Sequence, residues 1–246
     1  MSLKQLIRPL VPESIKAWRQ QRLVVENLLA ATKPLHPRSC PVCGYQGFFS
    51  HFGRPPRLDA QCPSCGCLER HRLFWLWFSS HPRPLEGPLL HFAPEPPLEK
   101  KFRQIYKDYS TASISNNADL RLDIEAIDLP AGSVNTVICN HVLEHVADSM
   151  ALKEIYRVLS DTGRLVASVP IIEGWERTYE DEGITDSAAR EVHFGQSDHV
   201  RYYGRDFRDR LRAAGFNTIE EVTAEGRSVV EYGLLPGDKI FLCSKG

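Results

Sequence analysis

The 246-residue sequence has no long apolar run. No segment approaches the roughly eighteen consecutive apolar residues that a membrane-spanning helix needs. The first residues also lack the continuous apolar core of a secretory signal. These two absences argue against a membrane span and lead us to expect a cytoplasmic protein. In that compartment, metal binding is favoured over disulfides for the seven cysteines.

An excess of charge of either sign is missing as well. The chain has 30 Lys and Arg against 31 Asp and Glu, a formal net charge of −1. As a whole it therefore has no electrostatic attraction to nucleic acid or to an anionic membrane surface. We expect a small-molecule or glycan-like substrate as the partner and do not expect nucleic acid. The sequence gives no indication of the oligomeric state.

Two Cys-x-x-Cys pairs near the start of the chain form the strongest local signal. Each pair lies beside a proline and a glycine that suit a tight knuckle. Four thiolates on two knuckles match the tetrahedral coordination of a structural Zn²⁺. The spacing predicts a zinc ribbon over residues 37–68, with Cys67 as a free thiol beside the site. The predicted ligands are Cys40, Cys43, Cys62 and Cys65.

Around this ribbon the chain divides into segments of different pattern. Residues 1–36 carry apolar positions at helical spacing, which predicts one or two helices that pack on the rest of the chain. Residues 69–87 read as a connecting helix and linker. We expect the helix to bury its aromatic side in a core, and a stacking platform for bases is the alternative. Those aromatic residues are Phe74, Trp75 and Trp77.

Residues 88–246 alternate short apolar runs with helical stretches, which is typical of a parallel sheet covered by helices on both faces. The fold class is therefore predicted as α/β, a doubly wound, mostly parallel seven-stranded sheet behind a small N-terminal zinc ribbon. A long polar insertion, residues 171–203, follows the fifth strand. The predicted strands are 89–92, 109–114, 121–124, 134–139, 164–169, 218–223 and 239–243.

In such a sheet a ligand lies beyond the carboxyl ends of the strands, and the residues there are unusually polar. The fourth strand and its turn, residues 134–146, read Val-Asn-Thr-Val-Ile-Cys-Asn-His-Val-Leu-Glu-His-Val. Together with 152–159 and 163–165, this stretch closely resembles class I S-adenosylmethionine-dependent methyltransferases of the methyltransferase type 11-like kind. The resemblance covers about residues 88–243. It implies a Rossmann-like fold and S-adenosylmethionine as cofactor. The whole chain is similar to a subgroup with a zinc ribbon ahead of this domain.

The turn after the first strand departs from the family pattern, because it reads His-Phe-Ala-Pro-Glu over residues 91–95 and has no Gly-x-Gly. A proline at the start of the next helix leaves free N–H groups for a carboxylate, and Glu95 is our hypothesis for the partner of the cofactor's ammonium group. The resemblance places Ser113 near the ribose, and Asp123 and Ile124 at the adenine. A turn or cap role is the alternative for Asp123. The full predicted cofactor set is His91, Ala93, Glu95, Ser113, Asp123, Ile124, Asn140 and His141.

Methyl transfer to oxygen or nitrogen often needs a base, and an unperturbed histidine titrates near neutrality. The predicted catalytic candidates are His145, His141 and His199. Capping of a helix start is the alternative for the cluster after the fourth strand.

The insertion is placed to close over the cofactor as a lid. A catalytic metal held by His193, Asp198 and His199, or structural hydrogen bonding, are the alternatives to substrate contact there. The predicted substrate-binding residues are Glu144, Trp175, Tyr179, His193, Asp198, Arg201 and Tyr203.

Taken together, the sequence predicts an S-adenosylmethionine-dependent methyltransferase with a structural zinc, acting on oxygen or nitrogen of a polar small-molecule or glycan-like acceptor. Three alternatives remain open. The degenerate turn fits a scaffold that has lost the cofactor. The ribbon and the basic N-terminal residues fit an RNA-modifying methyltransferase. The third is an enzyme that uses the sulfonium for another reaction.

Overall fold

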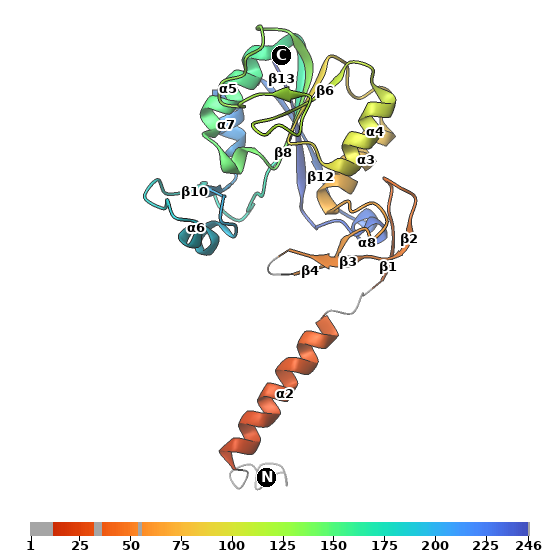
Figure 1. The fold of residues 1–246 in the computed structure, drawn as a ribbon, viewed down its shortest axis with the longest axis vertical. Coiled ribbons are helices and arrows are strands. Elements are labelled where there is room, and N and C mark those ends of the chain that lie inside the picture. The colour runs from red at the N-terminus through yellow and green to blue at the C-terminus, as the bar shows by residue number, and fades with distance from the viewer. Residues whose placement is uncertain (1–11, 32–35, 54–55, 246) are drawn as a thin grey trace.

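The computed structural model describes residues 12–31, 36–53 and 56–245 (Figure 1). Its centre is a seven-stranded sheet with the order β12-β13-β9-β8-β5-β6-β7. Strands β5 to β9 run parallel, and β13 is antiparallel to both of its neighbours. The strands are β5 (Leu89–Phe92), β6 (Tyr109–Ser113), β7 (Leu120–Arg121), β8 (Val134–Asn140), β9 (Leu159–Ser168), β12 (Thr218–Thr223) and β13 (Lys239–Ser244). This confirms the predicted fold class.

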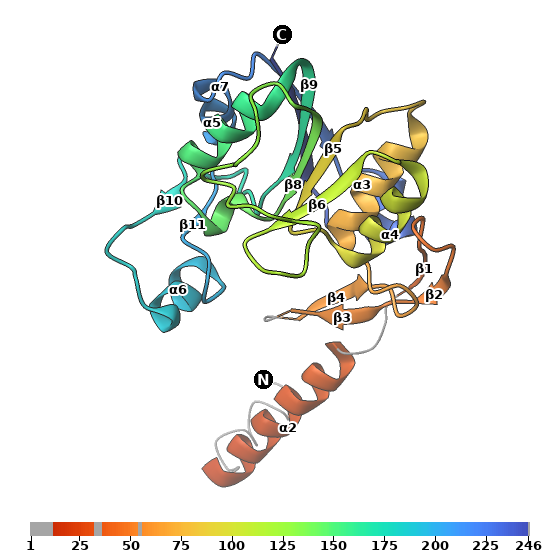
Figure 2. The ribbon, with the colours of Figure 1, turned by 45° about the horizontal axis from the view of Figure 1, so that its top comes forward.

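Helices cover both faces of the sheet (Figure 2). Helices α3 (Glu69–Ser80) and α4 (Pro96–Ile105) lie on one face, and α5 (Asp148–Val158) and α7 (Phe207–Ala213) on the other. Helix α5 turns a stripe of fully buried residues inward: Ala151, Leu152, Ile155 and Val158. Strand β8 is buried along nearly its whole length, as expected for a central strand with helices on both sides. Strand order reverses between β5 and β8, which makes their carboxyl ends the switch point of the fold.

The cysteine-rich segment forms two short antiparallel ribbons, β1 (Pro37–Ser39) with β2 (Gln46–Phe48) and β3 (Ser50–Phe52) with β4 (Arg57–Gln61). One hydrophobic core joins it to α3, α4 and one face of the sheet. Phe74 and Trp77 are buried in that core, so the core-packing prediction for α3 is confirmed for these two side chains.

Arg72 ties α3 to the ribbon. It is fully buried, and its guanidinium donates to the carbonyls of Ala60 (3.0 Å), Cys67 (2.9 Å) and Tyr232 (2.6 Å). Tyr232 ends the short helix α8 (Arg227–Tyr232), which the sequence did not predict. The guanidinium also lies 4.6 Å from the centre of the Phe49 ring. One buried cation therefore joins the ribbon, α3 and the segment that leads into β13.

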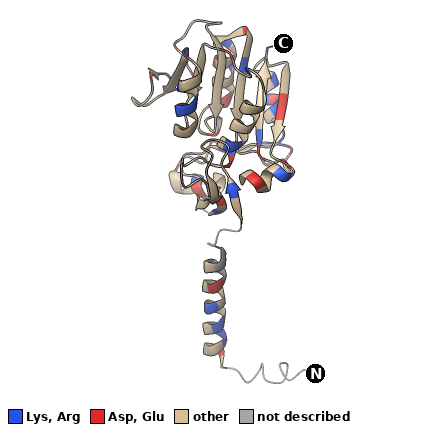
Figure 3. Ribbon diagram, turned by 90° about the vertical axis from the view of Figure 1, so that its right-hand side faces the viewer, with Lys and Arg blue, Asp and Glu red and all other residues tan. Residues whose placement is uncertain are grey.

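Near the N-terminus the described residues form one helix, α2 (Glu13–Ala31), which extends away from the body (Figure 1). The predicted helical positions before residue 12 lie outside the described residues. The expectation that this segment packs on the rest is wrong for α2, because Trp18, Leu23 and Val24 are exposed. Figure 3 shows charged residues along the same helix, which interrupt its apolar positions. None of the helices in the described ranges is long and apolar enough to cross a membrane.

The insertion is more ordered than the sequence suggested. It contains α6 (Ser187–Phe194) and a two-stranded ribbon of β10 (Tyr179–Glu180) and β11 (Arg201–Tyr202). The third strand is displaced from its predicted range: β7 covers only residues 120–121, so Asp123 follows the strand instead of lying in it. Strand β9, in contrast, starts at Leu159, five residues before the predicted fifth strand.

Candidate functional site

Two residues with positive φ mark the switch point. Ala93, directly after β5, has φ 45°, and His141, directly after β8, has φ 51°. This left-handed conformation costs a non-glycine residue about 1–2 kcal/mol, and such strain is concentrated at functional sites. Ala93 thus adopts a left-handed backbone conformation at this turn without being a glycine.

The start of α4 differs from our expectation. Pro96 and Pro97 have no N–H group, and the amides of Leu98 and Glu99 both donate to the carbonyl of Glu95, at 3.0 and 2.9 Å. The amide of Ala93 is also used, since it donates to the Ala112 carbonyl at 2.9 Å. The prediction of free N–H groups for a cofactor carboxylate at this helix start is therefore wrong. A second proline removes one donor, and the local turn consumes the next two.

Glu95 is buried at the N-terminus of α4. Its Oε2 lies 3.0 Å from Nε2 of His91, whose Nδ1 lies 2.8 Å from the Tyr109 hydroxyl. Burial alone would raise the pKa of Glu95, but the hydrogen bond and charge of His91 outweigh it and lower the pKa to about 2. Its Oε1 is buried without a hydrogen-bond partner. Contact with a cofactor ammonium stays a prediction, because that oxygen is covered in this structure.

The group that covers it is His71 of α3, with Nε2 3.7 Å from Oε1 of Glu95. The Leu68 amide donates to Nδ1 of His71, which leaves the ring proton on Nε2, facing Glu95. Burial lowers the pKa of His71 to about 4, although the charge of Glu95 opposes the shift. At neutral pH the contact therefore joins a neutral imidazole to a carboxylate. Sequence reasoning missed His71, and its only signal was its position on the buried side of the helix that follows the ribbon.

Other predicted cofactor residues lie at the same edge of the sheet. Ser113 ends β6 and is half-buried, with Oγ 2.9 Å from Oγ of Ser115. Asp123 is exposed and its Oδ1 accepts from the Glu125 amide at 2.9 Å, as the turn alternative requires. Ile124 is buried in the core. Asn140 ends β8, where its Oδ1 accepts from the Ser168 hydroxyl at 3.1 Å.

Glu144 is fully buried on a short 3-10 turn, η2 (Leu143–His145), just beyond β8. Its Oε1 lies 3.0 Å from Nδ1 of His141, whereas its Oε2 has no partner. Burial by itself raises the pKa of this carboxyl, but the hydrogen bond and charge of His141 reverse the shift and leave the pKa below its usual value. Glu144 is therefore an ionised, buried carboxylate at neutral pH.

His145 and His199 meet beside Glu144. Their rings are nearly perpendicular, at 83°, with centres 4.7 Å apart. The structure thus brings the three predicted catalytic histidines into one cluster with Glu144. The alternative metal set of His193, Asp198 and His199 is not brought together, since exposed His193 pairs with the Tyr179 hydroxyl at 2.6 Å.

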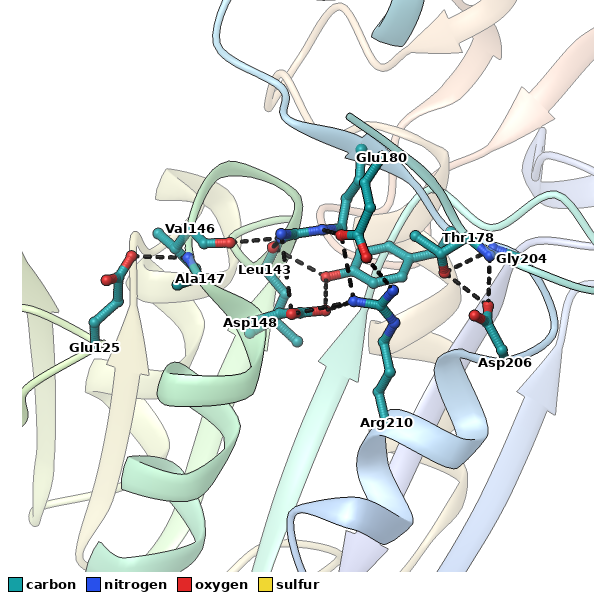
Figure 4. A network of polar contacts seen from close by, with 12 residues as sticks. Glu125, Leu143, Val146, Ala147, Asp148, Thr178, Glu180, Gly204, Asp206 and Arg210 are labelled. Carbon is teal, nitrogen blue, oxygen red and sulfur yellow. Dashed lines mark hydrogen bonds and ion pairs between the residues drawn. The ribbon is translucent and has the colours of Figure 1, made fainter. Parts of the chain in front are cut away.

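Arg201 and Tyr203 of the insertion hold the η2 turn through polar contacts with Leu143, Val146 and Asp148, which are labelled in Figure 4. The Tyr203 hydroxyl lies 3.0 Å from the Leu143 carbonyl and 2.9 Å from Oδ2 of Asp148. Arg201 donates to the carbonyl of Leu143 at 2.8 Å and to that of Val146 at 2.5 Å. Both side chains are buried and their polar groups are used inside the protein. Their predicted substrate contact gives way to a role in positioning Glu144 and His145.

A second arginine completes this network. Arg210 of α7 lies 3.0 Å from Asp148 and 2.5 Å from Glu180, so it links the helix to the insertion. Trp175 and Tyr179, by contrast, are 41% and 37% exposed on the insertion. These two and exposed Asp198 remain predictions for substrate contact.

Five cysteines converge in the ribbon. The Sγ atoms of Cys40 and Cys65 are 3.8 Å apart, and those of Cys43 and Cys62 are 3.7 Å apart. Both values fit the edge of a ZnS₄ tetrahedron, about 3.8 Å for a Zn–S bond of about 2.3 Å. Cys67, predicted as a free thiol, also joins the cluster. Ligand atoms of Cys40, Cys62, Cys65 and Cys67 all lie within 4.8 Å of one another, and this set of four does not include the predicted ligand Cys43.

The knuckle backbone is repeated in the two halves of the cluster. Gly44 donates its amide to the Cys40 carbonyl and Gly66 to that of Cys62, with φ of 80° and 74°. The residues present therefore fit a tetrahedral metal ion.

A cavity of about 540 Å³ lies at the opposite edge of the sheet, lined by residues that include Asn135, Thr136 and Arg164 near the starts of β8 and β9. Ligands of doubly wound sheets bind at the carboxyl edge. This cavity is therefore separate from the site described above.

Comparison with known proteins found one family model that matches part of the chain. Residues 99–167, from α4 to the end of β9, match the family model of a methyltransferase domain. No curated protein matches the chain.

Several solved structures are similar to it. A SAM-dependent methyltransferase of Thermotoga maritima, possible histamine N-methyltransferase, is 16% identical, with 71% of this chain and 88% of that chain covered and a TM-score of 0.48. An S-adenosylmethionine-dependent methyltransferase of Mesorhizobium loti is 14% identical, with coverages of 70% and 97% and a TM-score of 0.48. The 1,6-didemethyltoxoflavin-N1-methyltransferase of Burkholderia thailandensis, with bound S-adenosylhomocysteine, is 14% identical, with coverages of 63% and 68% and a TM-score of 0.41.

Proposed function

We propose that this chain, whose residues 99–167 carry a methyltransferase domain, transfers a methyl group from S-adenosylmethionine to oxygen or nitrogen of a polar small-molecule or glycan-like acceptor. One observation carries the proposal. The family match covers β8, one of the two strands at the switch point, and strained and polar residues of the chain gather at the same edge. That edge is where doubly wound sheets bind their ligands.

The cofactor would supply an electrophilic methyl group on a sulfonium. Ala93 and His141 shape the backbone at the ends of β5 and β8, and Ser113 and Asp123 would offer hydroxyl and carboxylate oxygens to the ribose and the adenine. The amides at the start of α4 are already used in hydrogen bonds. In this proposal Glu95, held by His91 and His71, provides part of the cofactor contact that a Gly-x-Gly turn and free N–H groups would otherwise provide.

On the acceptor side, Glu144 and His145 of the η2 turn lie in one cluster with His141 and His199. An O–H or N–H acceptor loses a proton as the methyl group arrives, and a group within hydrogen-bond reach has to receive it. Of the three histidines, His141 and His145 are partly exposed, whereas His199 is buried. We assign the insertion, on which Trp175 and Tyr179 are exposed, the role of a lid that would exclude water from this side.

The cysteine cluster is assigned a structural zinc in this proposal. A closed thiolate site stabilises a fold instead of performing chemistry. Here it fixes the ribbon, and through α3 it fixes His71 against Glu95. A reducing compartment such as the cytoplasm keeps these thiols available for the metal.

The test is methyl transfer itself. Zinc-loaded protein is incubated with methyl-labelled S-adenosylmethionine and pools of polar small molecules and glycans, and labelled products are separated by chromatography. We expect label in one acceptor class and one S-adenosylhomocysteine per methyl transferred. Binding of the cofactor without transfer to any pool would contradict the acceptor assignment. No binding at all would favour the scaffold alternative.

A further inference from the structure

The geometry points to a second metal site at the η2 turn, in which Glu144, His145 and His199 bind one divalent transition-metal ion. One ligand atom from each of the three residues lies within 4.8 Å of the other two. Two imidazoles and one carboxylate form a donor set suited to ions such as Fe²⁺, Co²⁺ or Zn²⁺. This set is distinct from the cysteine cluster, and it shares only His199 with the metal set of His193, Asp198 and His199 considered in the sequence.

Two buried polar atoms without a hydrogen-bond partner support the site. Oε2 of Glu144 and Nδ1 of His199 are both buried without a hydrogen-bond partner, on residues that are 0% and 4% exposed. Leaving a buried polar atom unpaired costs about 1–3 kcal/mol, and more for a charged group. Both atoms are lone-pair donors in one three-residue cluster, as metal ligands are. A cation satisfies both at once.

The surrounding hydrogen bonds orient the donors as second-sphere groups do around known metal ligands. The other oxygen of Glu144 is held by His141 at 3.0 Å. Nδ1 of His145 lies 3.3 Å from both the carbonyl and the carboxylate of Asp198, so that a proton on Nδ1 is shared with Asp198 and Nε2 carries the free lone pair. His199 makes a hydrogen bond with the backbone of Phe194. Each of the three ligands is therefore anchored through a group other than its free donor.

The backbone also fixes the distance between the two chain segments. The Val200 amide donates to the Glu144 carbonyl at 2.9 Å, which holds His199 against the η2 turn. Three protein ligands leave further coordination positions for water or for an acceptor oxygen. A bound ion uses the lone pairs of His145 and His199, so the ion takes over the activation of the acceptor that a free histidine would otherwise supply.

The experiment is calorimetric titration with Co²⁺, in the absence of S-adenosylmethionine, of protein loaded with only one zinc per chain. The zinc already fills the cysteine cluster. A lack of thiolate-to-cobalt absorption in the same sample then shows that Co²⁺ has not replaced it there. We expect about one Co²⁺ per chain and an affinity at least about tenfold lower in His145→Ala and Glu144→Gln. His51→Ala, which removes an exposed histidine of the ribbon, is the matched control and should bind as the wild type does.

Folding is checked by thermal unfolding of each variant. His145 is partly exposed, with 29% of its side chain accessible, so its removal tests the site even where replacement of buried Glu144 unfolds the chain. Two results overturn the proposal: no Co²⁺ binding beyond the ribbon, or equal binding by wild type and folded His145→Ala. Neither result bears on cofactor binding, which is measured separately.

Discussion

Nε2 of His91 and Oε2 of Glu95 lie 3.0 Å apart across the turn that follows β5. His91 is the third residue of β5, and Glu95 is the N-cap residue of α4. This contact therefore links the strand to the start of the next helix. This turn lacks the Gly-x-Gly that the resemblance led us to expect. Here a buried polar pair, supported by Tyr109 and His71, holds the same turn with side chains.

His71 should make stability depend on pH. Its pKa is about 4 in the folded protein and 6.5 for an unperturbed histidine. Between these values the unfolded chain binds a proton that the folded protein does not, so stability is complete above pH 6.5 and falls as the pH drops. Wild type should lose about 2 kcal/mol more than His71→Gln between about pH 7 and about pH 5. Urea unfolding of both proteins at each pH measures this, and parallel losses would refute the assignment.

Ala93 should tolerate glycine but not a branched side chain. Its φ of 45° is strained for any residue with a Cβ, and valine adds a second branch at that position. Ala93→Val should lower the free energy of unfolding by about 1–2 kcal/mol and weaken S-adenosylmethionine binding, whereas Ala93→Gly should keep both. Ala131→Val is the control, because Ala131 is exposed and has no positive φ. Equal effects at the two sites would show that the turn is not constrained.

Much of this fold could be predicted because its signals are local. Alternation of apolar runs placed β5, β6, β8, β12 and β13 within one residue of their observed ends, and the paired cysteines marked the ribbon. The elements that were missed are short. Helix α6 and the β10–β11 ribbon are polar, and ion pairs of Arg201 and Arg210 with Glu180, far away in sequence, hold the ribbon in place. No local sequence pattern predicts such long-range contacts.

The candidate site was predictable in its location but not in its connections. Residues after each strand end had to meet, because parallel strands share a carboxyl edge. That His71 of α3 would reach Glu95 could not be inferred, because it depends on how the ribbon packs against the sheet. The buried state of Tyr203 and Arg201 was equally hidden, since polar residues in a long insertion look like surface residues in the sequence.

The cysteine ligands can be distinguished by single substitutions. Cys43 and Cys62 are separated by 3.7 Å, as two ligands of one zinc should be. Cys40 and Cys67 are separated by only 3.3 Å, which is shorter than a shared tetrahedral edge. Cys43→Ser should therefore release zinc and lower the melting temperature, whereas Cys67→Ser should keep one zinc per chain. Metal analysis after gel filtration checks this, and the opposite pattern would assign Cys67 as the fourth ligand.

Tyr203 should affect turnover only by holding the η2 turn in position. Removing its hydroxyl leaves Asp148 and the Leu143 carbonyl without that partner, at a cost of about 1–2 kcal/mol in stability. Tyr203→Phe should also slow methyl transfer, because η2 carries Glu144 and His145. Cofactor affinity should remain close to that of wild type. Tyr202→Phe, a neighbouring half-buried tyrosine, is the control, and unchanged turnover in Tyr203→Phe would rule out the positioning role.

The central claim is that this glycine-free turn still binds S-adenosylmethionine. Calorimetric titration of zinc-loaded protein with S-adenosylmethionine and S-adenosylhomocysteine tests it most directly, with Asp123→Ala as the site variant and Asp161→Ala, exposed in the β9 segment, as the control. The account predicts binding of both ligands at one per chain, weakened in Asp123→Ala and retained in Asp161→Ala. Absence of binding to the folded wild type would contradict it.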